Sequence, residues 1–243
     1  MPIYHASHVE YHIATGHIQI VMDDGTQLPA YWAHPTLGKV FPGIALLHDW
    51  WGFDDLTRRL ANYFAQMGYY VIAPDLFFGE QTTDPREAMR LVERYQKESY
   101  HRVDTALAVL EKHHQCNAKV AAIGLGMGGS LVFEAAIRRP DLEAAIAFGG
   151  FPQSYLDEID KATTPILALY GSEEPYTKPP VLRALKKAFE KSPLPHKLEI
   201  LPGLGHTFFS QDFTPEQRAQ SAHALELTLD FMEQHLAENE DES

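Results

Sequence analysis

A regular alternation of apolar, strand-like runs with amphipathic helical stretches constrains this chain most strongly. Residues 43–48 form a continuous apolar run, which is typical of a strand buried on both faces of a parallel sheet. Strands that alternate with helices predict an α/β fold, with a mostly parallel central sheet and helices on both of its faces. The predicted strands are 43–48, 69–73, 118–124, 144–148, 165–170 and 197–201, and the predicted helices are 54–67, 85–114, 128–138, 180–191 and 215–236.

Two further strands precede this region and are expected to pair with each other. Residues 18–22 and 28–33 are rich in strand-forming residues, and turn-forming residues separate them, so we predict a β-hairpin at about 18–34. No internal repeat or Gly/Ser-rich linker divides the 243 residues, of which 45% are hydrophobic. We therefore expect a single domain over residues 1–243 that ends in a disordered acidic tail at 237–243.

Composition excludes several classes of protein. The formal net charge of −13 is opposite in sign to the basic footprint of a nucleic-acid-binding protein, so no nucleic-acid partner is expected. The single cysteine, Cys116, cannot form an intrachain disulfide and fits a reducing compartment. The first residues lack the pattern of a signal peptide, and no apolar run approaches the roughly 18 residues that cross a bilayer. We expect a cytoplasmic protein without a membrane partner.

A glycine-rich turn follows the predicted strand 118–124. The run Gly-Leu-Gly-Met-Gly-Gly at 124–129 has the form of a nucleophile elbow, the sharp strand-to-helix turn G-x-S-x-G that lifts a nucleophile above a sheet. Gly126 occupies the place of the serine or cysteine and has no side chain. The same glycines fit the dinucleotide fingerprint G-x-G-x-x-G, but strand 144–148 does not end in the carboxylate that this fingerprint needs.

Polar residues follow three of the other predicted strands. Asp49 comes after strand 43–48, Glu174 after strand 165–170, and His206 after strand 197–201. Ligands of open α/β sheets bind at the carboxyl ends of the strands. The chain order of elbow, acid and histidine is also the order of the triad in α/β-hydrolases. These residues therefore predict a catalytic site, with Glu173 as the alternative acid.

Four sequence blocks resemble the dienelactone hydrolase family. The resemblance runs from about residue 40 to the last predicted helix. It implies an α/β-hydrolase fold and an enzyme that cleaves lactones and other carboxylic esters through a cysteine or serine nucleophile, without a metal or organic cofactor. The blocks are HDWWG at 48–52, GYYVIAPDL at 68–76, GLGMGG at 124–129 and GHTF at 205–208.

The resemblance also implies a role for each candidate residue. It makes His206 the catalytic base and Glu174 the acid that orients it. Asp49 matches a glutamate of the family that contacts the resting nucleophile. The main-chain N–H groups of Met127 and Trp50 match the oxyanion hole, the pair of donors that stabilises the negative oxygen of the transition state.

Gly126 departs from the family pattern at the group that carries covalent catalysis. Loss of the nucleophile of a serine hydrolase costs about 10⁶ in turnover, so we expect weak or absent covalent turnover of a small-molecule ester or lactone. Three alternatives stay open: a non-catalytic small-molecule binder, a nucleophile-knockout variant of an active hydrolase, and a site where His206 and a carboxylate activate water in the space over Gly126. The sequence also leaves open whether the protein is a monomer or a homodimer.

Other candidate side chains fit these roles poorly. Cys116 precedes strand 118–124 and therefore belongs to the opposite edge of the sheet. Ser130 is one helical turn beyond the elbow, and Ser172 is not on a strained turn. Four N-terminal histidines lack the compact spacing of a metal site, so no metal is expected. They are His5, His8, His12 and His17.

Overall fold

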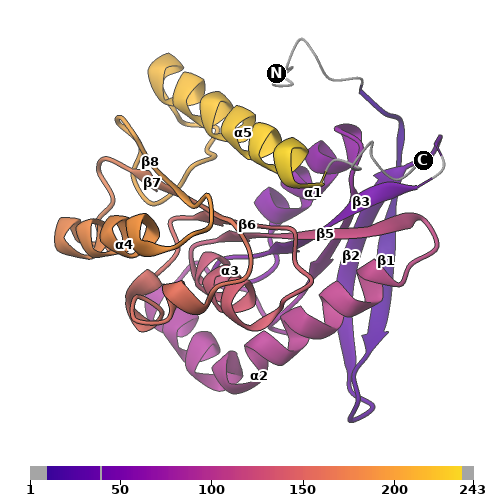
Figure 1. The fold of residues 1–243 in the computed structure, drawn as a ribbon. Coiled ribbons are helices and arrows are strands. Elements are labelled where there is room, and N and C mark those ends of the chain that lie inside the picture. Colours follow the sequence, from indigo (N-terminus) through magenta and orange to yellow (C-terminus); the bar gives the residue numbers. More distant parts are fainter. Residues whose placement is uncertain (1–9, 39, 237–243) are drawn as a thin grey trace.

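One eight-stranded sheet organises the computed structural model, which describes residues 10–38 and 40–236 (Figure 1). Its strands lie in the order β1-β2-β4-β3-β5-β6-β7-β8. β1 and β2 form an antiparallel hairpin, β2 runs antiparallel to β4, and each pair from β4 to β8 is parallel. The strands are β1 (Ile13–Val21), β2 (Gln27–Pro35), β3 (Phe41–Leu47), β4 (Tyr70–Pro74), β5 (Cys116–Leu125), β6 (Ala144–Phe148), β7 (Ile166–Gly171) and β8 (Lys197–Leu201).

Helices cover both faces of this sheet (Figure 1). Successive strand residues such as Ala121 and Ala122 belong to two different apolar cores, because neighbouring side chains of a strand point to opposite faces. One core holds residues of α2, α3 and α4, and the other holds residues of α1 and α5. This arrangement confirms the predicted α/β fold. The helices are α1 (Asp55–Gln66), α2 (Pro85–Glu111), α3 (Met127–Arg138), α4 (Pro179–Lys191) and α5 (Pro215–Leu236), with short 3₁₀ turns η1 (Pro152–Ser154) and η2 (Ile159–Lys161).

The predicted elements differ from the observed ones only near their ends. The hairpin is longer than predicted, because β1 and β2 pair from Ile13 opposite Pro35 onward. α2 ends at Glu111 rather than at 114, where a tighter turn joins His113 N–H to the Leu110 carbonyl. Within the described ranges, no helix has the length and apolar character to cross a membrane. The predicted acidic tail, 237–243, lies outside the described residues.

The parallel register brings the carboxyl ends of six strands, β3 to β8, to one edge of the sheet. Leu47 of β3 pairs with Gly124 of β5, and Leu125 of β5 pairs with Phe148 of β6. β7 pairs with β6 and β8 pairs with β7 in the same direction. The loops that leave these strands therefore begin side by side, at the edge where α/β sheets bind ligands.

Candidate active site

The turn between β5 and α3 is formed by Gly126. Its backbone has φ +48° and ψ −108°, in the left-handed region that favours glycine. Its N–H donates to the carbonyl of Phe148 at 2.8 Å. A Cβ on Gly128 would lie 2.5 Å from the carbonyl oxygen of Leu47, so main chain packs directly against main chain here. The local geometry has the features of a nucleophile elbow even though residue 126 has no side chain.

The carboxylate of Asp49 fills the space above this turn. A Cβ built on Gly126 would lie 2.1 Å from Asp49 Oδ1 and 2.4 Å from its Cγ. Oδ1 accepts hydrogen bonds from the main-chain N–H of Trp50 at 2.7 Å and of Met127 at 2.9 Å. The expectation of free space for a water molecule over Gly126 is therefore wrong, because a side chain from the β3–α1 loop occupies it.

His206 lies beside this carboxylate and pairs with Glu174. Its Nδ1 is 2.8 Å from Glu174 Oε2, and its Nε2 is 3.7 Å from Asp49 Oδ2. The other oxygen of Glu174 accepts the Tyr176 N–H at 2.7 Å, which fixes the carboxylate. Since Glu174 Oε2 can only accept when ionised, Nδ1 carries the proton in this pair. The structure brings Glu174 to the histidine, whereas Glu173 is exposed and contacts Leu204 through its main chain.

The two carboxylates determine the charge of the imidazole. Burial of His206 disfavours its charged form, but Asp49 and Glu174 outweigh burial and raise the pKa of His206 to about 9. Burial likewise acts to raise the pKa of Glu174, yet the hydrogen bonds from His206 and the Tyr176 N–H lower it overall. At neutral pH His206 is thus protonated beside two anions. A general base must be neutral, so the resting site is not ready for base catalysis.

A cavity of about 230 Å³ opens onto Asp49 and His206. Its walls include the side chains of Leu125, Phe148 and Phe209. Apolar walls with a few converging polar groups are typical of small-molecule sites. A small ligand in this cavity would therefore contact both the carboxylate and the imidazole.

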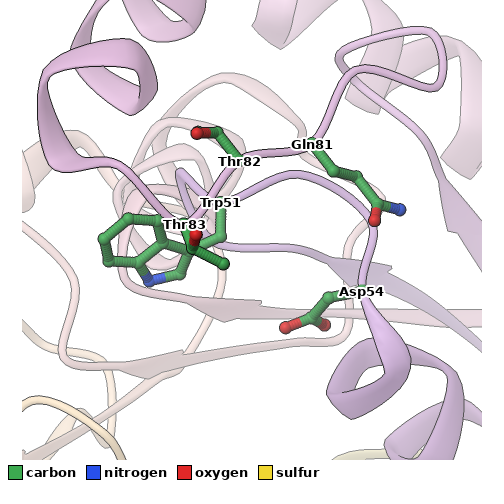
Figure 2. A pocket seen from close by; sticks show the side chains of 5 residues that line it. All are labelled: Trp51, Asp54, Gln81, Thr82 and Thr83. Atoms are coloured by element: carbon green, nitrogen blue, oxygen red, sulfur yellow. The ribbon is translucent and has the colours of Figure 1, made fainter.

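A larger cavity of about 750 Å³ shares two lining residues, Trp51 and Asp54, with this one (Figure 2). Its other lining residues, Gln81, Thr82 and Thr83, come from the segment between β4 and α2. The Thr82 N–H donates to the Trp51 carbonyl at 3.1 Å, which holds the two loops together. The larger cavity contains neither His206 nor Glu174, so the reacting centre is expected in the smaller one.

Residues 28–236 match the model of the dienelactone hydrolase family. The chain belongs to this family. Protein usf of Aquifex pyrophilus is 26% identical over 225 residues, which cover 88% of this chain and 96% of that protein. A Yersinia pestis protein named as a candidate carboxymethylenebutenolidase is 25% identical over 232 residues, or 88% of this chain and 86% of that one. A candidate dienelactone hydrolase structure from Klebsiella pneumoniae has a TM-score of 0.82 at 21% identity, covers 92% of this chain and 99% of its own, and supports the fold.

In this member of the dienelactone hydrolase family, the substitute nucleophiles considered above are engaged elsewhere. Cys116 is buried at the start of β5, at the opposite end of that strand from Gly126. Ser130 Oγ accepts the Phe151 N–H at 2.9 Å. Ser172 Oγ accepts the Gly203 N–H at 2.9 Å. None of these three side chains faces His206 in the way that Asp49 does.

His48 is a positioning residue that is not among the site residues predicted from the sequence. It is fully buried, and burial lowers its pKa, so the ring is neutral. Its Nδ1 is 2.6 Å from the carbonyl oxygen of Asp49, and its Nε2 accepts the Leu76 N–H at 3.0 Å. The ring thereby fixes the main chain that carries Asp49. A histidine at the end of a wholly apolar strand was the signal that could have indicated this role.

The N-terminal histidines give no metal site in the part of the chain that is described. No group of three or more His, Cys, Asp or Glu residues there could hold a metal ion. His17 packs edge-on against Tyr31, with ring centroids 5.4 Å apart. His5 and His8 lie outside the described residues.

Proposed function

We propose that this chain has the active site of a carboxylic-ester or lactone hydrolase in which covalent turnover through residue 126 is weak or absent. The observation that carries the proposal is the His206–Glu174 pair, which lies beside the Asp49 carboxylate that the N–H groups of Met127 and Trp50 bind. The names of the relatives support the substrate class, since a carboxymethylenebutenolide is a lactone.

The apparatus that remains can act on an acyl group without a side chain at residue 126. A carbonyl oxygen that displaced Asp49 Oδ1 would receive the N–H groups of Trp50 and Met127, and each such donor is worth roughly 2.7–4 kcal/mol in a transition state. Neutral His206 would then take a proton from the attacking water, with Glu174 stabilising the imidazolium. Attack by water lacks the covalent step, so slow turnover is expected.

A non-catalytic binder of small molecules is the second candidate function. It is favoured by one observation, the occupation of both N–H donors by Asp49 Oδ1. A ligand in the adjoining cavity would then contact His206 and apolar walls without being activated.

Restoring the nucleophile separates these two functions. We expect the Gly126→Ser/Asp49→Ala double variant to hydrolyse p-nitrophenyl acetate at least about 100-fold faster than the unmodified chain, since it regains a nucleophile and frees the donors. Gly126→Ser alone should gain less, because its Cβ would lie 2.1 Å from Asp49 Oδ1.

The matched control is the addition of His206→Ala, which should return the double variant to its starting rate. A folded double variant that shows no gain would indicate that the pocket now serves binding. Equal ester hydrolysis by the unmodified chain and its His206→Ala variant would contradict base catalysis by His206.

A further inference from the structure

The carboxylate of Asp49 lies where a nucleophile would project from the elbow. Its three heavy atoms, Oδ1, Cγ and Oδ2, lie 2.1, 2.4 and 2.6 Å from the Cβ position of residue 126. Carboxylates act as covalent nucleophiles in several enzyme classes. This one has a histidine and a second carboxylate behind it, as a hydrolytic nucleophile requires.

The two oxygens of Asp49 have different surroundings. Oδ1 accepts from two main-chain N–H groups, whereas Oδ2 lies 3.7 Å from His206 Nε2. Asp49 also lines the cavity of about 230 Å³. Oδ2 is therefore the oxygen available for attack on a ligand, while Oδ1 is already held by the donors that stabilise an oxyanion.

We propose that Asp49 acts as a nucleophile toward saturated carbon and hydrolyses small alkyl halides through an ester on its own side chain. Attack on an acyl carbon would give a mixed anhydride and would need the same two N–H donors that Oδ1 occupies. Attack on a saturated carbon needs no oxyanion hole in its first step. The arrangement thus favours alkyl transfer over acyl transfer.

The reaction has two balanced steps. In the first, a lone pair of Asp49 Oδ2 forms a bond to carbon as the carbon–halogen bond breaks, and the halide leaves with the bonding electrons. In the second, water attacks Cγ of Asp49 and gives a proton to His206, and the oxyanion forms on Oδ1. The Cγ–Oδ2 bond then breaks, the alcohol leaves with the proton from His206, and the regenerated acid ionises. The sum is alkyl halide plus water to alcohol, halide and a proton.

The charges around His206 suit this order of steps. The ring faces Asp49 and Glu174, with the edge of Tyr176 against it at a centroid distance of 4.9 Å. Esterification removes the charge of Asp49 and with it one of the two causes that keep His206 protonated. Esterification therefore lowers the pKa of His206, so the ring releases its proton to water more readily after the alkyl group has been transferred, which is when the second step needs a base.

Trapping the ester tests the proposal. The probe is 1-bromobutane, and the trap is the His206→Gln variant, which lacks the base for the second step. We expect intact-mass and peptide analysis to find one butyl group on the Asp49 peptide of that variant, and steady bromide release at least about 100-fold below that of the unmodified chain. The Asp49→Asn variant should neither gain the butyl group nor release bromide. Asp55 is an exposed carboxylate nearby, and its Asp55→Asn variant should behave as the unmodified chain.

Three results would overturn the proposal: a butyl group on another residue, bromide release by the unmodified chain without any adduct in His206→Gln, or neither adduct nor bromide in any variant. The inference goes beyond the ester hydrolase proposed above but uses the same His206–Glu174 pair. The two proposals can fail independently, because hydrolysis of p-nitrophenyl acetate reports acyl chemistry and bromide release from 1-bromobutane reports attack on saturated carbon.

Discussion

Two clusters at opposite ends of α3 each hold one cation among carboxylates, and only one of them has the features of an active site. Near the C-terminal end, Arg139 is 7% exposed and contacts Asp104, Glu111 and Asp141 at 2.7, 2.9 and 3.0 Å. Near the N-terminal end, His206 lies between two carboxylates at 2.8 and 3.7 Å. The number of charges is therefore a poor guide to function in this molecule.

The two cations differ in whether they can release a proton and in which groups surround them. A guanidinium is not deprotonated in proteins, and the partners of Arg139 come from α2 and from the turn that follows α3. Its network joins α2 to the turn after α3 and has a structural role. His206 can release its proton, and it faces both a cavity and the Oδ2 atom of Asp49.

The largest expected effect is a loss of stability when the Arg139 cluster is broken. Arg139→Ala should lower the free energy of unfolding by about 3 kcal/mol, because three carboxylates lose their shared cation. The neighbouring Arg138→Ala removes only a half-exposed pair with Glu134 and should cost about 0.5 kcal/mol or less. Urea denaturation measures both. Similar losses in the two variants would contradict the structural role of Arg139.

The next effect concerns the charge of His206. NMR titration should give a pKa near 9, and Asp49→Asn should lower it by about one unit, equivalent to about 1.4 kcal/mol. Because the folded pKa exceeds the usual value of about 6.5, this stabilisation is complete below that pH and is lost as the pH rises through 9. A pKa that Asp49→Asn leaves unchanged would show that the Asp49 carboxylate does not hold the proton on His206.

A further effect, similar in size to the previous one, concerns the elbow glycine. Gly126→Ala should destabilise the fold by about 1–2 kcal/mol, since it combines a φ of +48° with displacement of the Asp49 carboxylate. Gly25→Ala is the matched control, because it also has a positive φ but its Cβ would meet nothing within 4 Å. The difference between the losses in free energy of unfolding of the two variants measures how firmly Asp49 is held in place. Equal losses would mean that Asp49 moves away freely.

Sequence patterns were sufficient for the fold but only for part of the site. Apolar runs and helical spacing located the strands and helices, since each pattern is local. The choice between Glu174 and Glu173 could not be made in this way, because adjacent loop residues point in different directions and only the loop's path decides. The contact of Asp49 with the space over Gly126 joins two loops 77 residues apart in the chain (126 − 49). No local sequence pattern encodes a contact between residues so far apart in the chain.

The central claim is that Asp49 replaces the nucleophile missing at residue 126, and isotope transfer tests it most directly. The protein would turn over 1-bromobutane in water enriched in heavy oxygen, at a protein concentration above that of the probe. We predict that the heavy oxygen enters the carboxylate of Asp49 and that the first butanol formed contains ordinary oxygen. Heavy oxygen in that butanol, with none in the Asp49 peptide, would show direct attack by water and would contradict the claim.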